Sequence, residues 1–174
     1  MAYCVAYIFA LLGGCLASER LYEVELNNLE VTPSEIEDFV DYGTLRLVRK
    51  ARNTFAVSGT LSILQNIGDE AYIFYVIYKL GAFDGQRRKY LDGNGRVCKL
   101  ISGDEYIYPQ MLNYSNLPSK DTCPFPKGNY TVNDFVVDER KLPAIIPPGE
   151  WLIVVKLMRD GKLGAGYRIN FTTK

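Results

Sequence analysis

The stretch that decides the fold lies near the C-terminus, where residues 151–173 read WLIVVKLMRDGKLGAGYRINFTT. Asp160 and Gly161 supply the positive φ angles that a tight two-residue hairpin turn requires. Beyond this turn the residues alternate between apolar and small or polar types. The apolar positions are Leu163, Ala165, Tyr167, Ile169 and Phe171, and the others are Gly164, Gly166, Arg168, Asn170 and Thr172. The stretch therefore predicts an antiparallel hairpin with one buried face.

Similar strand patterns run through the preceding part of the chain. Residues 53–65 alternate, which predicts a strand with one face in water. Residues 71–80 and 151–158 are apolar on both sides, so we expect these strands to be covered on both faces. Further strands are expected at residues 21–29, 45–50 and 130–137.

One segment between the strands has a helical pattern instead. Apolar residues from Cys98 to Leu112 recur at helical spacing, but Gly103 and Pro109 predict a short or broken helix. Short strands dominate the rest of the chain, and neither a repeat nor a linker interrupts them. We therefore predict one mostly β domain, a two-sheet antiparallel sandwich with one short helical segment around residues 98–112.

The N-terminal residues 1–18 have the composition of a secretory signal peptide. Residues 2–16 carry no charged side chain and are largely apolar, and the small residues Ala17 and Ser18 follow. The run is too short to favour a retained membrane anchor, although no Lys or Arg precedes it, which leaves that alternative open. We expect cleavage near residue 18 and a secreted, extracellular domain of residues 19–174.

Cysteine and asparagine positions agree with secretion. Cys4 and Cys15 fall within the predicted signal, so the mature chain keeps only Cys98 and Cys123. In an oxidising compartment such a pair most simply forms one disulfide. Asn-x-Ser/Thr sequons, which predict N-glycosylation of exposed side chains, occur at Asn113, Asn129 and Asn170.

The composition excludes several functional classes. The chain has 20 Lys and Arg against 20 Asp and Glu, so it lacks the positive charge of a nucleic-acid-binding protein. It has no His, which excludes Ser-His-Asp and Cys-His catalysis and His-ligated zinc. No phosphate-binding loop occurs, and residues 92–95, Asp-Gly-Asn-Gly, lack the further ligands of a calcium loop and predict a tight turn. We expect no catalytic group, no metal and no cofactor.

Charged residues leave two weaker hypotheses open. A hydrolase of the glycosidase type needs only two carboxylates that face one cleft, and Glu35, Asp104 and Glu105 are among many candidates. Basic residues cluster at 46–52 and 87–89 and could contact an anionic membrane surface. Because acidic residues are interspersed with these clusters, we interpret them first as solubilising charge.

Residues around the second mature cysteine resemble a known family. Residues 123–130 read CPFPKGNY, Cys98 precedes them, and Leu-Pro at 142–143 and Pro-Gly-Glu-Trp at 148–151 follow. Over residues 98–173 this pattern resembles a large family of small secreted insect proteins of largely unknown function. That family includes the chemosensory CheA and CheB proteins and is similar to the lipid-recognition (ML) domain and the ganglioside activator protein. The resemblance implies a Cys98–Cys123 disulfide and two sheets that splay apart into an apolar cup for a hydrophobic molecule.

The residue pattern is compatible with such a cup but does not distinguish it from a filled core. Candidate pocket-wall residues are Phe55, Val57, Phe74, Val76, Trp151, Ile153, Val155, Tyr167, Ile169 and Phe171. Our hypothesis is a secreted, non-enzymatic binding protein for a lipid, hydrocarbon or pheromone in a chemosensory setting, with a receptor or membrane surface as a further candidate partner. The alternative is a secreted recognition module with a packed core that acts through protein–protein contacts. The oligomeric state is not predicted.

Overall fold

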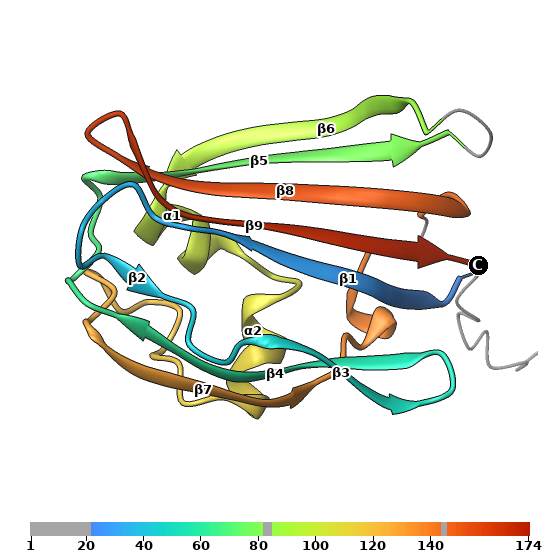
Figure 1. Ribbon diagram of the computed structural model, residues 1–174, viewed down its shortest axis with the longest axis horizontal. Coiled ribbons are helices and arrows are strands. Elements are labelled where there is room, and N and C mark those ends of the chain that lie inside the picture. Colours follow the sequence, from blue (N-terminus) through green and yellow to red (C-terminus); the bar gives the residue numbers. More distant parts are fainter. Residues whose placement is uncertain (1–21, 82–84, 144–145) are drawn as a thin grey trace, which may run out of the picture.

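Strands make up most of the structure. A computed structural model describes residues 22–81, 85–143 and 146–174, in which the strands form two antiparallel sheets that face each other (Figure 1). The larger sheet has the order β1 (Val24–Thr32), β9 (Lys162–Thr173), β8 (Gly149–Arg159), β5 (Ala71–Leu80) and β6 (Arg87–Arg96). In the smaller sheet, β4 (Thr54–Ile63) pairs with β2 (Val40–Asp41), β3 (Arg46–Ala51) and β7 (Gly128–Phe135). The predicted fold class, a mostly β antiparallel sandwich, is confirmed.

The C-terminal hairpin forms where it was expected. Asp160 and Gly161 adopt φ angles of 51° and 76°, and the flanking Arg159 and Lys162 pair with each other. The inward residues of β9 also face their counterparts on β8, in the pairs Ala165–Leu157, Tyr167–Val155, Ile169–Ile153 and Phe171–Trp151. Paired residues share one face of a sheet, so both strands present these side chains to the space between the layers.

A bulge near the turn makes room for Phe39. Gly164 is the extra residue of β9, and a Cβ atom added there would lie 2.2 Å from Cε1 of Phe39. The guanidinium of Arg159 lies 4.6 Å from the centroid of the same ring. Phe39 is 1% exposed and belongs to the main buried cluster. Glycine at 164 thus permits an aromatic ring to close this end of the sandwich.

The helical segment is short and broken, as predicted. It consists of α1 (Val97–Gly103), α2 (Tyr108–Met111) and the 3-10 turn η2 (Leu112–Tyr114). The carboxylate of Asp104 accepts hydrogen bonds from the backbone N–H groups of Tyr106, Ile107 and Tyr108, at 2.8, 3.2 and 2.7 Å. Asp104 is the C-cap residue of α1, and its carboxylate thus satisfies the N–H groups of the segment that leads into α2. A second 3-10 turn, η3, covers Glu139–Lys141.

The predicted disulfide is present. Cys98 on α1 is bonded to Cys123 in the loop before β7, with the two Cα atoms 5.7 Å apart. Nearby, Ile67 and Phe125 exchange two backbone hydrogen bonds of 2.9 and 2.8 Å. The helix and two loops are therefore tied together beside the sheets.

Two expectations about the larger sheet are wrong. Residues 92–95 do not form a turn but lie within β6, because Gly93 leaves the space into which the ring and hydroxyl of Tyr75 pack. Strands β5 and β8 are not covered on both faces, since Tyr72 and Phe74 on the outer side of β5 and Lys156 on the outer side of β8 are exposed. The apolar character of β5 on both sides therefore reflects an uncovered outer face rather than a third layer.

The predicted signal peptide, residues 1–18, lies outside the described residues, as does the expected cleavage site. Among the residues that the structure describes, no helix has the length and apolar character needed to cross a bilayer. Of the three sequon asparagines, Asn113 and Asn129 are exposed. Asn170 is half-buried and pairs with Leu152 and Asn28 on the outer side of the larger sheet.

Candidate ligand-binding cavity

A cavity of about 210 Å³ lies between the two sheets and is partly open to solvent. We refer to it as the apolar cavity. Strands β5, β8 and β9 line one side with Ile73, Val155, Leu157, Ala165, Gly166 and Tyr167. The other walls come from β2, β4, α1 and the connecting loops, with Val40, Tyr42, Leu61, Ile63, Ile67, Val97, Ile101 and Phe125.

The walls of the apolar cavity are almost entirely hydrocarbon. Among the described residues that line it, the only polar side-chain groups are the hydroxyls of Tyr42 and Tyr167, and none is charged. Such a site favours an apolar guest, because binding removes apolar surface from water on both partners. Its described lining holds no pair of side chains suited to acid–base or nucleophilic catalysis.

The Tyr42 hydroxyl connects the two sheets at the edge of this cavity. It donates a hydrogen bond of 2.6 Å to the carbonyl oxygen of Gly166 and accepts one of 2.6 Å from the Gly166 N–H. Gly166 lies opposite Thr32, the last residue of β1. The Tyr42 hydroxyl therefore hydrogen-bonds to the backbone of β9 at the point where its pairing with β1 ends. Burial raises the pKa of Tyr42, and the hydrogen bond with Gly166 partly opposes that rise.

Tyr167 faces the cavity from the middle of β9. Its side chain remains 37% exposed, yet burial raises the pKa of Tyr167 to about 12, and the nearby Tyr42 and Asp104 add to the rise. A phenol in open solvent would not be desolvated in this way. Tyr167 pairs with Val155 on the inward face of β9 and lines the cavity, which is itself partly open to solvent.

Only some of the predicted pocket-wall residues line the apolar cavity. Val155 and Tyr167 do so, and Ile153 and Ile169 continue the same face of β8 and β9 beyond it. Further along that face, Trp151 and Phe171 are buried and stacked, with ring centroids 6.1 Å apart. On β4, Phe55 lines a different cavity, and Val57 lies between Phe55 and Leu61 along the strand.

The prediction placed Phe74 and Val76 on the wrong face of β5. In β5 it is Ile73 that pairs with Leu157 and faces the cavity, so Phe74 and Val76 point to the opposite side. Phe74 pairs with Lys156 and is 42% exposed. Because both sides of β5 are apolar, alternation could not reveal which side faces inward.

Several lining residues escaped the sequence prediction. Leu61 and Ile63 continue the alternation of β4 and could have been found from it. Ile67, Val97, Ile101 and Phe125 come from loops and α1. Their positions depend on the disulfide and on the Ile67–Phe125 pairing, which no local pattern encodes.

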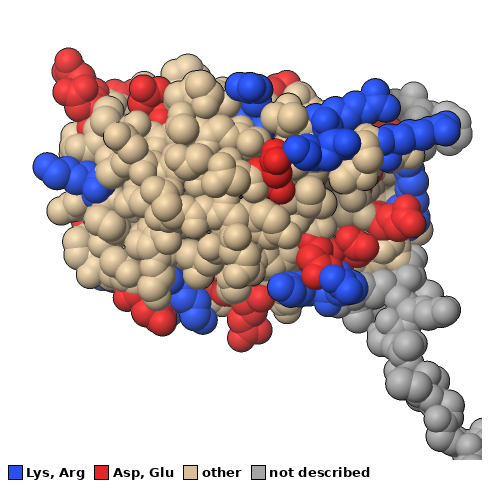
Figure 2. Space-filling model, turned by 90° about the horizontal axis from the view of Figure 1, so that it is seen from below, with Lys and Arg blue, Asp and Glu red and all other residues tan. Residues whose placement is uncertain are grey.

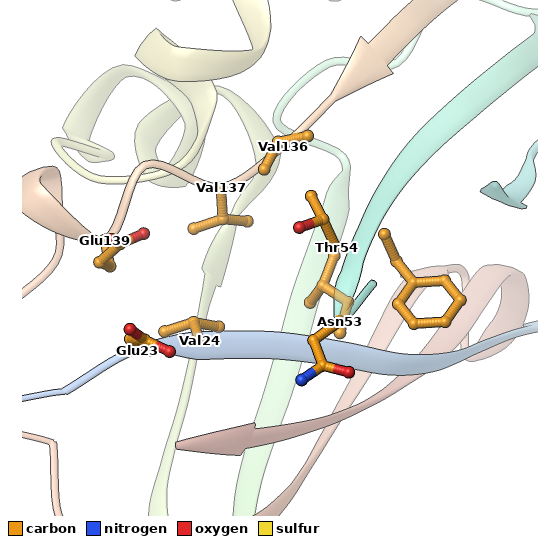
Figure 3. A pocket seen from close by; sticks show the side chains of 9 residues that line it. Glu23, Val24, Asn53, Thr54, Val136, Val137 and Glu139 are labelled. Carbon is orange, nitrogen blue, oxygen red and sulfur yellow. The ribbon is translucent and has the colours of Figure 1, made fainter. Parts of the chain in front are cut away.

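A second cavity, of about 300 Å³, lies beside the start of β1 and the turn between β3 and β4 (Figure 3). We refer to it as the polar cavity. Its lining combines Val24, Leu26, Phe55, Val136 and Val137 with the polar residues Glu23, Asn53, Thr54 and Glu139. In Figure 3, Glu23 and Glu139 lie toward one end of the cavity, and Asn53 and Thr54 lie toward the other.

Two of the carboxylates named from the sequence have structural roles. Asp104 caps the segment that leads into α2, and Glu35 accepts a hydrogen bond of 2.9 Å from the Leu163 N–H. Glu105 is exposed. The carboxylates that share one cavity are Glu23 and Glu139, which the sequence did not single out.

Basic and acidic side chains are mixed on the surface. Figure 2 shows Lys and Arg interspersed with Asp and Glu around a broad uncharged area. From the two basic clusters, Lys50 pairs with Asp134 at 2.7 Å and Lys89 pairs with Asp92 at 3.1 Å. Exposed pairs of this kind contribute little to stability. They agree with the interpretation of both clusters as solubilising surface charge.

One group of possible metal ligands occurs among the described residues. It consists of Asp69, Cys98 and Cys123. The two cysteines form the disulfide and therefore offer no thiolate. This group is not suited to hold a metal ion.

No curated protein matches the chain. A family model does match, over residues 74–153, which run from β5 into β8 and make up a little under half of the chain. The matched family is described as a protein of unknown function, DUF1091, so this part of the chain is similar to an uncharacterised family.

Proposed function

We propose that this protein binds a small apolar molecule in the apolar cavity and has no catalytic activity. The observation that carries the proposal is the unfilled, hydrocarbon-lined space between the sheets. The inward residues Val57, Ile153 and Ile169 also stay only half-buried. A core in which the two layers interlock would bury such side chains fully.

The size of the cavity limits the guest. An apolar protein cavity of about 150 Å³ holds benzene, so about 210 Å³ suits a ring or chain of roughly eight carbon atoms. Burying roughly eight methylenes contributes about 6 kcal/mol before the cost of association, so the dissociation constant should be no tighter than about 10–100 µM. A long-chain lipid would require the sheets to move apart. We therefore place short hydrocarbons and volatile, pheromone-like molecules ahead of membrane lipids.

The setting that we propose is extracellular. The Cys98–Cys123 bond fits an oxidising compartment, and Asn113 and Asn129 are exposed and accessible to glycosylation. In that setting a carrier delivers its guest to a receptor or membrane surface, which is the chemosensory role that the family resemblance implies.

Thermal unfolding with added benzene tests the proposal. At a concentration of about one hundred times the dissociation constant, a ligand stabilises the folded state by about 2.7 kcal/mol, and the melting temperature should rise by roughly 5 to 10 °C. The variant Ala165→Phe places a ring in the apolar cavity and should lose this response. Lys156→Phe puts the same ring on the exposed outer side of β8 and should keep it.

Other outcomes favour the alternatives. If wild type and Ala165→Phe respond alike, or neither responds, the cavity is not a binding site and a recognition module with surface contacts is favoured. The polar cavity favours the hydrolase alternative, because Glu23 and Glu139 both line it. Hydrolysis of chromogenic glycosides that disappears in Glu139→Gln would support that alternative.

A further inference from the structure

One polar group stands out within the apolar cavity, the hydroxyl of Tyr167. A phenol carries one O–H donor, which an acceptor on a guest in the cavity can engage. The Tyr167 hydroxyl makes no hydrogen bond to any residue that the structure describes, whereas the Tyr42 hydroxyl is engaged by Gly166. Tyr167 is thus the free donor among the described cavity walls.

Two buried tyrosines of the core have an acceptor within the chain. Tyr108 donates to the carbonyl oxygen of Pro118 at 2.9 Å, and Tyr130 donates to that of Pro126 at 2.6 Å. Each of these hydroxyls therefore has a backbone acceptor from the same chain. Tyr167 differs because its side chain points into an unfilled space rather than against a loop.

The carboxylate of Asp104, which acts on Tyr167 as a neighbouring charge, already accepts backbone hydrogen bonds. It raises the pKa of the Tyr167 phenol, but its oxygens accept the N–H groups of Tyr106, Ile107 and Tyr108. The presence of this carboxylate also disfavours an anionic guest in the cavity. A neutral acceptor is therefore the partner that suits the Tyr167 hydroxyl.

We propose that Tyr167 is a specificity-determining residue and that the guest of the apolar cavity is a neutral, mainly hydrocarbon molecule with one oxygen acceptor, such as a ketone, aldehyde or ester. This inference rests on the proposed binding function and names its ligand class. The hydrocarbon part fills the space lined by Ile73, Val155 and Leu157, and the oxygen accepts from Tyr167. A hydrocarbon of the same shape binds without this bond.

A two-by-two comparison isolates this hydrogen bond. The probes are 2-heptanone and 2-methyl-1-heptene, which differ by an oxygen in place of a CH2 group. Their equilibrium binding to the secreted protein is measured by headspace gas chromatography, with wild type and Tyr167→Phe in parallel. The ratio of ketone to alkene affinity should be about five- to tenfold higher in wild type than in Tyr167→Phe. Tyr72→Phe, on the outer side of β5, is the control and should keep the wild-type ratio.

The outcomes separate the inference from the proposed function. If both probes bind and the ratio is the same in wild type and Tyr167→Phe, the role of Tyr167 is refuted and the binding function stands. If neither probe binds to any of the three proteins, the binding function itself fails. If Tyr167→Phe loses both probes equally, Tyr167 acts through packing and the inference is refuted as well.

Discussion

Replacing Tyr42 with phenylalanine removes one oxygen atom that makes two hydrogen bonds between the sheets. In Tyr42→Phe the N–H and the carbonyl oxygen of Gly166 both lose their partner, and Gly166 is buried. Each lost hydrogen bond of this kind lowers the free energy of unfolding by about 1 kcal/mol, and a buried group left without a partner lowers it further. Because the adjoining cavity is partly open, water can reach Gly166 and limit the loss. We expect a destabilisation of about 2 kcal/mol.

Urea unfolding followed by circular dichroism measures this effect. With an m-value of about 2 kcal/mol/M, the midpoint should fall by about 1 M while the slope stays unchanged. Tyr72→Phe removes a hydroxyl from an exposed position and should leave the midpoint unchanged. A midpoint shift in Tyr42→Phe no larger than that of Tyr72→Phe would refute the idea that this hydroxyl holds the sheets together.

Three further predictions concern packing, the disulfide and pH. Gly164→Ala should lower the free energy of unfolding by about 1–3 kcal/mol in the same assay, because its Cβ atom would lie 2.2 Å from Phe39. Gly103→Ala is the control and should not destabilise the protein, because no atom lies within 4 Å of the added Cβ. Equal effects of the two substitutions would contradict the packing at the bulge. Cys98→Ser combined with Cys123→Ser opens a loop of 25 residues and should cost about 3.5 kcal/mol, and no loss of stability would show that the cross-link is dispensable. Burial raises the pKa of Tyr108 from 10.0 to about 12, so the folded state favours the neutral phenol. The free energy of unfolding should therefore be constant below about pH 10 and decline toward pH 12, with a weaker decline in Tyr108→Phe. A free energy of unfolding that does not change over that pH range would contradict the burial of this hydroxyl.

Local patterns were sufficient for the strands that lie half in water. The Asp-Gly turn and the alternation of β9 predicted the hairpin and its inward face from Ala165 onward, because one side of that strand is apolar and the other is not. The bulge was not predicted: it places Leu163, expected to face inward, opposite Met158 on the outer side, and turns Gly164 toward Phe39. In β5 both sides are apolar, since the outer side is exposed rather than polar, and the inward face was therefore misassigned at Phe74 and Val76.

Long-range contacts explain the other differences. Residues 92–95 look like a turn because glycine is frequent in turns, but Gly93 serves to admit the ring of Tyr75 from the neighbouring strand. Likewise, Ile67 and Phe125 are separated in the sequence and meet only through their backbone pairing. The cavity could be expected from the family resemblance, but its loop and helix walls could not.

A crystal structure of the protein under xenon pressure tests the existence of an accessible apolar cavity most directly. Xenon enters dry, apolar protein cavities without needing a specific polar contact. We expect xenon density in the space lined by Ile73, Val155 and Leu157. Side chains that close this space, with no xenon between the sheets, would contradict the binding function.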